Sequence, residues 1–410
     1  MTEPRACFIV GNYRPEAFGI GRYIPHYVDA LAAAGWTAEV FAPFPFYPAW
    51  RLDHTVPQES LEAGGRVRIH RYAPFVPRRP AGAARALHDL SLGWHAIRSL
   101  YVRAAPADLF VAASPPLLGG AVTVHVARRR RRPSLVLAYD MVGDLAGDTL
   151  GPVTGWSARA LRAVEARMYA GASQVIALTG EMAKRIETIS GRTAAVSVLR
   201  TWADDGLFGL DHDAAATRFR SEQRLSPATR LIGFAGNFGR KQQLPELAEA
   251  ASKLSDDFRA VFIGDGPHRL DLERVAAAHP DRIRVLPPVS EADLHTFLAA
   301  CDTSIVVAWT RHDGSLFPSK AANILAAGCP IVAVTPPASE LAQLVTREEL
   351  GVVCPSLAPE ALRAALSRGA ELGRVAAQRA RCREYAETHL RRQAATDRFV
   401  REARQLVSLR

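Results

Sequence analysis

The chain has 410 residues, of which 48% are apolar and 22% charged. This balance is typical of a folded globular protein and excludes a disordered or fibrous chain. The length exceeds what one hydrophobic core usually supports, so we expect two domains. The net charge of +10 favours acidic partners such as nucleotides, phosphates or anionic lipid surfaces. Abundant arginine and alanine offer a second explanation of that charge, the base composition of the coding DNA.

The five cysteines are scattered without a Cys-x-x-Cys pair, so neither a disulfide framework nor a zinc site is predicted. Four of them lie in or beside apolar runs, as buried free thiols do, which fits a reducing cytoplasm. The first residues lack the apolar stretch of a signal peptide, and no window approaches the ~20 apolar residues that span a bilayer. We expect a cytoplasmic protein, either soluble or peripheral on the inner face of the cell membrane.

Short apolar runs typical of β-strands alternate with helical patterns through the first half of the chain. These runs begin at Ala6, Thr37, Arg66, Asp108, Ser134, Ser173 and Ala195. Helical patterns lie between most of them, for example over residues 20–34 and 158–170. Near-continuous apolar strands joined by helices predict a parallel sheet covered on both faces.

The alternation starts again after a polar stretch over residues 204–230. The new runs begin at Leu231, Phe258, Arg282, Thr303 and Pro330. Two such series predict an α/β chain of two Rossmann-like domains, residues 1–210 and 211–373, which share a ligand cleft beyond the carboxyl ends of their strands. Residues 374–410 form a long, Arg-rich helical pattern, which we expect to pack back along the body of the protein.

The loop after the first strand carries Gly19 and Gly21 just before a helical pattern. Glycines at a helix N-terminus allow a ligand to approach backbone amides, which favour anions. The loop lacks G-x-G-x-x-G spacing, and no acidic residue ends the second strand. Both observations argue against a nicotinamide-dependent enzyme.

The strand from Leu231 ends in Gly236 and Asn237, and Arg240 and Lys241 follow. Backbone amides beside two cations suit a diphosphate, whereas a glycine turn with solvated basic residues is the alternative. The next two strands end in turns that are expected to shape the same pocket. These turns contain Gly264, Pro288 and Val289, and we expect a nucleotide base to rest on backbone groups near the last two.

Residues 311–334 predict a loop that ends at Pro318, then a helix that runs to Ala327 and stops at Gly328. Backbone amides at the start of that helix predict a second anion site. The residues expected there are Leu316, Phe317, Ser319 and Lys320.

Together these segments resemble the large retaining group of GT-B glycosyltransferases called family 4, and within it the colanic-acid and O-antigen type. The stronger matching segments are residues 12–24, 45–50, 236–242, 264–267 and 316–333, and the weaker are 139–144 and 201–204. The match covers roughly residues 5–355 and is specific as a combination, although no single piece is.

The resemblance implies transfer of a sugar from a nucleotide sugar to a glycan or polyprenyl-diphosphate-linked acceptor in surface-polysaccharide synthesis. A UDP-sugar is favoured, with a GDP-sugar as the alternative, and no cofactor is implied. The N-terminal domain would bind the acceptor and the C-terminal domain the donor. Asp140 would orient or deprotonate the acceptor hydroxyl, with Asp144 also on the acceptor side. Lys241, helped by Arg240, would neutralise the donor diphosphate from one side and Lys320 from the other, while the loop with Gly19 and Gly21 approaches the donor.

Two departures from the family pattern concern the donor sugar and the domain connection. Family 4 enzymes commonly carry two glutamates eight positions apart, where this chain has Ser315 and Asn323. Asn323 can still form a hydrogen bond with a ribose hydroxyl. Thr201 stands where the subfamily usually has asparagine.

Retention of the anomeric configuration in this family is usually explained by attack of the acceptor on the same face that the diphosphate leaves, with the leaving diphosphate assisting. This mechanism needs no metal, which agrees with the lack of a strand-end Asp-x-Asp in the sequence.

Two basic segments raise the question of a membrane. Residues 77–105 form a basic, amphipathic pattern with aromatic residues, which suits either an anionic bilayer or lipid acceptor, or an ordinary helix that buries its apolar stripe. The five arginines at 128–132 suit either a solvated helix end or a polyanion.

No basic-aromatic motif indicates nucleic acid. A non-hydrolysing sugar-nucleotide epimerase and a non-catalytic sugar-nucleotide-binding subunit are the alternative functions.

Overall fold

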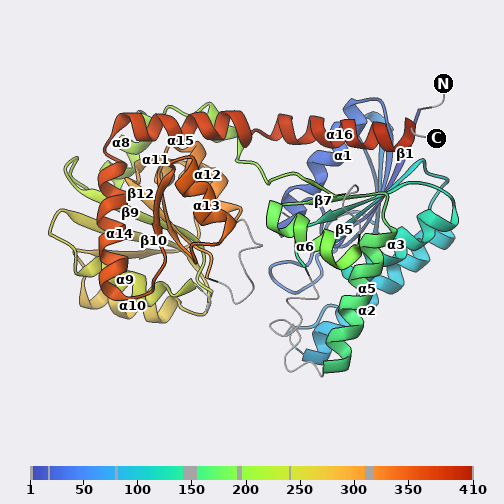
Figure 1. Cartoon of the computed structure of the whole chain (residues 1–410), viewed down its shortest axis with the longest axis horizontal. Coiled ribbons are helices and arrows are strands. Elements are labelled where there is room, and N and C mark those ends of the chain that lie inside the picture. The colour runs from blue at the N-terminus through green and yellow to red at the C-terminus, as the bar shows by residue number, and fades with distance from the viewer. Residues whose placement is uncertain are drawn as a thin grey trace. The chain divides into compact units, whose positions relative to one another are not determined.

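The computed structural model describes residues 3–16, 19–78, 82–141, 155–191, 196–239, 242–309 and 318–408. The chain divides into two compact units, the first made of Met1–Arg200 with Ala395–Arg410 and the second of Thr201–Ala394. Each unit has one mainly parallel β-sheet flanked by helices (Figure 1). The predicted α/β class is therefore confirmed.

The sheet of the first unit has eight strands in the order β3-β4-β2-β1-β5-β6-β7-β8, all parallel except for the β3–β4 pair. The strands are β1 (Arg5–Ile9), β2 (Thr37–Pro43), β3 (Glu59–Glu62), β4 (Val67–Tyr72), β5 (Leu109–Ser114), β6 (Ser134–Ala138), β7 (Gln174–Ala177) and β8 (Val196–Val198). Of these, β3 was not predicted, because its sequence, ESLE, is polar and forms the sheet edge.

The helices of the first unit connect these strands. They are α1 (Ile24–Ala33), α2 (Gly82–Arg98), α3 (Leu117–Arg129), α5 (Gly155–Gly171) and α6 (Gly180–Ser190), with the short turns η1 (Gly19–Arg22) and η2 (Ala63–Gly65) and the π-helical η3 (Ser99–Arg103). No helix among the described residues has the length and apolar character needed to cross a membrane.

The sheet of the second unit has six parallel strands in the order β11-β10-β9-β12-β13-β14. The strands are β9 (Arg230–Asn237), β10 (Phe258–Asp265), β11 (Ile283–Leu286), β12 (Thr303–Val307), β13 (Ile331–Val334) and β14 (Gly351–Cys354). The helices are α7 (Asp205–Phe208), α8 (His212–Glu222), α9 (Leu244–Ser252), α10 (Arg269–Ala278), α11 (Glu291–Ala300), α12 (Lys320–Ala326), α13 (Glu340–Arg347), α14 (Pro359–Leu372) and α15 (Ala376–His389).

The C-terminal helical pattern forms two helices, α15 and α16 (Arg392–Ser408), which are separated at Leu390 and Arg391. The first helix buries Cys382 and Tyr385 in the core of the second unit. From residue 395 onward, α16 belongs to the first unit, where the Phe399 ring lies 4.5 Å from that of Tyr27. The single apolar stripe of residues 374–410 therefore packs into two different hydrophobic cores.

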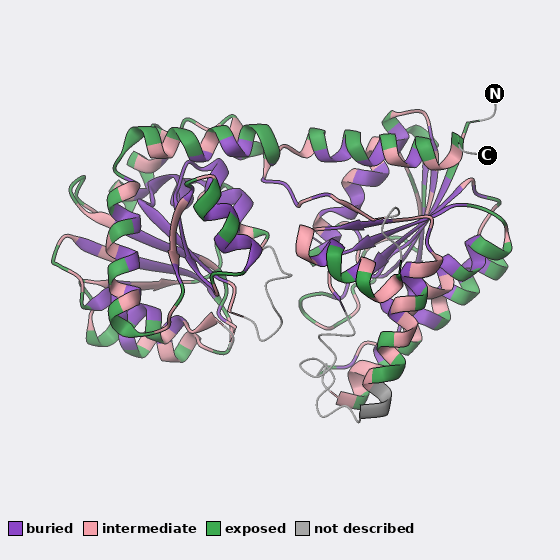
Figure 2. Ribbon diagram, viewed as in Figure 1, coloured by how far each residue is buried: buried purple, intermediate pink, exposed green. Residues whose placement is uncertain are grey.

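The interior strands of both sheets are buried along most of their length (Figure 2). All five cysteines are buried and unpaired, as expected from their apolar surroundings. In each sheet the first strand lies in the interior, since β1 pairs with β2 and β5, and β9 pairs with β10 and β12. Ligands of open α/β sheets bind at the carboxyl ends of the strands where the order reverses, which here means β1/β5 and β9/β12.

A buried carboxylate joins several segments of the second unit at the amino ends of its strands, opposite the edge where a ligand is expected. Asp302, only 4% exposed, accepts a hydrogen bond from the Leu231 amide at 2.7 Å and one from Arg220 Nη2 at 2.9 Å. Its other oxygen lies 2.9 Å from Arg374 Nε. One anion therefore joins β9, α8 and the segment between α14 and α15.

We expect Asp302→Ala to lower the free energy of unfolding of the second unit by about 3–5 kcal/mol, because the change leaves two guanidinium groups without their anion. Urea denaturation followed by circular dichroism would measure the loss. Asp213→Ala, at an exposed position on α8, is the matched control. Equal stabilities of the two variants would contradict the proposed anchoring.

Candidate functional site

The turns after β9 and β10 make a close backbone contact at the carboxyl edge of the second sheet. Gly236 has φ +140° and Gly264 φ +153°, a region that favours glycine, and a Cβ on Gly264 would overlap the carbonyl oxygen of Gly236. The Phe238 amide donates to the Asp265 carbonyl at 2.8 Å. Gly264 is therefore required by the packing of the two turns on each other, and Gly236 is favoured by its backbone conformation.

Lys320 places a cation beside these turns. Its Nζ donates to Gln242 Oε1 at 3.2 Å and lies 4.0 Å from the centre of the Phe234 ring. A Cβ on Gly236 would come within 3.5 Å of the same Nζ, so the ammonium lies directly against this turn. Burial lowers the pKa of Lys320 from 10.5 to about 7.

No carboxylate among the described residues pairs with Lys320. Among those residues its partners are a neutral amide and a ring. An ammonium whose charge is disfavoured by desolvation in this way can bind an incoming anion strongly. The position at the β9/β12 reversal is also where a ligand is expected. The geometry therefore suits a phosphate group.

The helix that carries Lys320 follows the sequence prediction closely. It spans Lys320–Ala326, with Ser319 before it in helical conformation and Gly328 after it at φ +71°. The Ser319 side chain forms no capping hydrogen bond. Six predicted site residues lie outside the described residues: Asp144, Arg240, Lys241, Ser315, Leu316 and Phe317.

Asn323, one turn after Lys320, is buried and bound to Asp204. Its Oδ1 accepts from the Asp204 amide, and its Nδ2 donates to Asp204 Oδ2, both at 2.9 Å. The same Asp204 oxygen lies 3.2 Å from His295 Nε2. Both ends of the Asn323 amide are thus engaged by Asp204, and a ribose hydroxyl would have to compete with these bonds. Sequence reasoning did not single out Asp204, whose partner is 119 positions away.

Asp204 also belongs to a group that could hold a cation. Together with Glu291 and His295 it places three ligand atoms within 4.8 Å of one another. Because Asp204 Oδ2 already accepts a hydrogen bond from Asn323, we interpret the group as a brace that holds the start of α7 against α11 and α12.

The turn after β11 contributes Pro288 and Val289 to the same edge of the sheet. Both are exposed, and β11 runs parallel to β10, with Leu286 opposite Ile263. The turns after β9, β10 and β11 therefore lie at one edge of the sheet, as predicted. Their contact with a base stays a prediction.

In the first unit, Asp140 follows β6 beside the β1/β5 reversal. Its amide lies 3.4 Å from the Ser114 carbonyl oxygen at the end of β5, and the neighbouring Tyr139 stacks on Tyr23 with ring centres 6.1 Å apart. Desolvation raises the pKa of Asp140 from 3.8 to about 6. A carboxyl group with that pKa can exchange protons near neutral pH.

The loop between β1 and α1 is organised around Glu16, which sequence reasoning missed. This buried carboxylate accepts hydrogen bonds from Asn12 Nδ2 at 2.9 Å, from the Phe46 amide at 2.8 Å and from the Tyr47 amide at 2.7 Å. A Cβ on Gly21 would come within 2.9 Å of the Glu16 carbonyl oxygen, whereas Gly19 is exposed at φ +56° with open space around it. Only Gly19 therefore has room for a ligand at its Cα.

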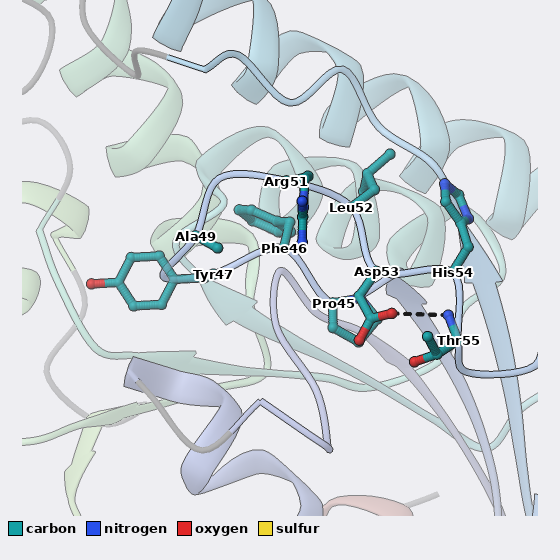
Figure 3. Close-up of a pocket in the computed structure, with 9 residues that line it drawn as sticks. All are labelled: Pro45, Phe46, Tyr47, Ala49, Arg51, Leu52, Asp53, His54 and Thr55. Atoms are coloured by element: carbon teal, nitrogen blue, oxygen red, sulfur yellow. Dashed lines mark hydrogen bonds between the residues drawn. The ribbon is translucent and has the colours of Figure 1, made fainter. Parts of the chain in front are cut away.

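Residues 45–55 enclose a hollow of about 520 Å³ next to the segment that Glu16 holds (Figure 3). Its lining includes Tyr47, Arg51 and Asp53, and Asp53 Oδ1 accepts from the Thr55 amide at 2.9 Å. Polar and apolar residues line the hollow to a similar extent, and all of them belong to one continuous segment of chain. The sequence drew attention to residues 45–50 without predicting a hollow there.

Comparison with known proteins matches both units to enzymes. Residues 18–202 match the glycosyl transferase 4-like domain, and residues 229–371 match the glycosyl transferases group 1 domain. The chain is 28% identical over 415 residues to the putative colanic acid biosynthesis glycosyl transferase WcaI of Escherichia coli K12. That alignment covers 96% of this chain and 98% of the relative.

Solved structures share the fold over the whole chain. Sucrose-phosphate synthase from Thermosynechococcus elongatus has a TM-score of 0.73 at 18% identity, and the match covers 100% of both chains. Anabaena HepE in complex with UDP has a TM-score of 0.71 at 13% identity, and the match covers 98% of this chain and 100% of HepE. Two domain matches and a full-length relative therefore agree with the two α/β units, and the chain belongs to the glycosyltransferases of the GT-B fold.

Proposed function

We propose that this enzyme is a retaining glycosyltransferase that moves a sugar from a UDP-sugar, with a GDP-sugar as the alternative donor, to a glycan or polyprenyl-diphosphate-linked acceptor. The observation that carries the donor assignment is the desolvated ammonium of Lys320 beside the glycine turns. The colanic-acid assignment of the Escherichia coli relative and the UDP bound to HepE support the direction of this proposal. The pathway we infer is surface-polysaccharide synthesis.

The donor diphosphate is bound by Lys320 in this proposal, with Lys241 and Arg240 as further cations. Charge on the departing diphosphate grows in the transition state, and a preorganised cation in a desolvated site stabilises that charge more than water does. Asn237, Ser315 and Ser319 are proposed polar contacts. Transfer in this scheme needs no metal ion, because side-chain cations meet the charge of the diphosphate.

The acceptor hydroxyl is oriented or deprotonated by Asp140 in this proposal. Retention of configuration follows if the acceptor attacks the face that the diphosphate leaves. The bond from the anomeric carbon to the diphosphate oxygen then breaks as the bond to the acceptor oxygen forms, and the hydroxyl proton passes to the departing diphosphate or to Asp140. The raised pKa of Asp140 supports an exchange of this kind.

We expect the affinity for UDP to fall as the pH rises from about 7 to about 9, by up to roughly tenfold per pH unit. The free protein has a Lys320 pKa of about 7, so the ammonium that binds the diphosphate must take up a proton at higher pH. Calorimetric titration in buffers of different ionisation enthalpy would measure both the affinity and the proton uptake.

Lys320→Met should weaken UDP binding and remove this pH dependence. Lys253→Met, at an exposed position after α9, is the matched control and should behave as wild type. A wild-type affinity that is flat with pH would overturn the assigned role of Lys320. Turnover of a sugar-nucleotide panel tests the transferase separately, and binding without turnover with any acceptor would favour a binding subunit.

For Asp140→Asn we expect two opposite effects. Activity should fall by roughly a hundredfold or more, and the acidic limb of the kcat/KM profile near pH 6 should disappear. Because the folded pKa is raised above the ordinary 3.8, Asp140 lowers the stability of the native state as the pH rises from about 3.8 to about 6, and the loss is complete above pH 6. The amide removes that penalty and should raise the free energy of unfolding at pH 7 by on the order of 1–3 kcal/mol, with no gain at acidic pH.

Thermal melts at two pH values and initial rates of sugar transfer would measure these effects. Asp213→Asn on α8 is the control and should change neither quantity. A loss of stability in Asp140→Asn would show that Asp140 has a structural role instead.

A further inference from the structure

The hollow formed by residues 45–55 takes no part in the proposed roles of Lys320 and Asp140. It follows β2 at the carboxyl edge of the first sheet and has a volume of about 520 Å³ (Figure 3). In Figure 3, Tyr47 lies at one end of the hollow, and Asp53 and His54 lie at the other. Pockets of this size hold small organic ligands. The hollow is therefore a candidate for a second binding site in the first unit.

The lining of the hollow mixes apolar and polar side chains. Pro45, Ala49 and Leu52 contribute apolar surface. Arg51 and Asp53 contribute polar groups of opposite charge. A sugar ring has the same mixed character, because its C–H groups form apolar faces and its hydroxyls both donate and accept hydrogen bonds at the rim. The lining therefore matches a sugar ring better than a purely apolar or a purely ionic ligand.

The charges in the hollow favour a neutral ligand over an anion. Asp53 Oδ1 accepts a hydrogen bond from the Thr55 amide at 2.9 Å, and bonding to Thr55 lowers the pKa of Asp53. The carboxylate is therefore ionised at neutral pH, and it would repel a phosphate or sugar carboxylate that approached Arg51. A hydroxyl can instead accept from the guanidinium and donate to the carboxylate. A neutral sugar ring fits these two groups, and a diphosphate does not.

Two contacts hold this segment in place before a ligand arrives. Glu16 Oε1 accepts from the Phe46 amide at 2.8 Å and from the Tyr47 amide at 2.7 Å. The buried ring of Phe46 also packs on His88 of α2, with ring centres 5.0 Å apart. A site that is already ordered loses less conformational entropy when it binds a ligand. Glu16 is therefore a positioning residue for the hollow.

The sheet order separates the hollow from the proposed site of reaction. Asp140 follows β6, and β2 lies three strands away from β6 in the order β2-β1-β5-β6. At about 4.8 Å per strand, the carboxyl ends of β2 and β6 are about 14 Å apart. A single sugar ring is shorter than this distance. A sugar in the hollow would therefore not be the ring whose hydroxyl lies at Asp140.

We propose that the hollow binds a neutral sugar ring of an oligosaccharide acceptor, remote from the ring that receives the new bond. This inference rests on the proposed transfer to a glycan acceptor with Asp140 at the reacting hydroxyl. A glycan that extends from Asp140 to the hollow gains binding energy from a part that does not react, whereas a monosaccharide acceptor gains none. Acceptor length is thus a determinant of specificity.

An array of immobilised glycans tests the hollow without requiring turnover. The full-length chain, carrying a fluorescent label, is applied to neutral mono- to tetrasaccharides and to oligosaccharides in which every ring carries a carboxylate. Neutral tri- and tetrasaccharides should bind on the order of tenfold more strongly than neutral monosaccharides, and more strongly than the acidic oligosaccharides of equal length.

Ala49→Phe fills the hollow and removes none of its polar groups. Ala49 is exposed, so the larger side chain does not disturb the core. The variant should bind neutral tetrasaccharides roughly tenfold more weakly, and its kcat/KM should fall for tetrasaccharide acceptors and stay unchanged for monosaccharide acceptors. Ala277→Phe, at an exposed position on α10, is the matched control and should behave as wild type.

Glu16→Gln tests the positioning role. Asn12 Nδ2 donates to Glu16 Oε2 at 2.9 Å, so glutamine at position 16 would place its own N–H groups against that donor. We expect the preference for tetrasaccharides over monosaccharides to fall about fivefold. Asn12→Asp combined with Glu16→Gln restores an acceptor opposite the new donor and should recover the preference. A role in stability alone would lower the melting temperature and leave the preference unchanged.

Equal binding of neutral mono- and tetrasaccharides would overturn the proposal, as would undiminished binding by Ala49→Phe. Stronger binding of the acidic oligosaccharides would assign the hollow to an anion and would also overturn it. The proposed reaction fails in a different way. Length-dependent glycan binding by a chain that transfers no sugar would support the hollow and contradict the reaction, whereas transfer that is independent of acceptor length would do the reverse.

Discussion

The reversal of strand order inside each sheet is the constraint on which the rest of this structure depends. Because β1 and β9 lie in the interior, the chain fills one side of each sheet and then returns to fill the other. The loops on the two sides separate at their carboxyl ends, which leaves room for a ligand there. Lys320 and Asp140 stand at these openings, and the glycine turns at Gly236 and Gly264 hold the loops close to the sheet edge.

Both units keep an ionisable group where its charge is disfavoured. Burial lowers the pKa of Lys320 and raises that of Asp140, so each group costs folding free energy in its charged form. Such groups persist in stable proteins when other interactions compensate for them. Asp302 and Glu16 illustrate the compensation. Asp302 binds donors from three separate segments, and Glu16 binds one donor from its own loop and two consecutive amides of another segment.

Apolar runs and glycines that end helices are local signals in the sequence. They made it possible to predict the strand positions, the two α/β units and the end of α12 before Gly328. The division between α15 and α16 could not be predicted, since one apolar stripe in the sequence packs into the hydrophobic cores of both units. Glu16 and Asp204 were also missed, because their partners lie about 30 and 119 positions away and nothing near them in sequence indicates the pairing. The cations at 240 and 241 were predicted from sequence and lie outside the described residues.

The bond between Asn323 and Asp204 has a consequence for how such enzymes diverge. Glutamate is common in family 4 at the position of Asn323, but here it would place a second carboxylate against Asp204. An amide donates to that carboxylate and also accepts from its backbone N–H, so the two positions form a complementary pair. We expect lineages with asparagine at 323 to keep aspartate at 204, and lineages with glutamate to have lost it. Substitutions at these two positions should be inherited jointly.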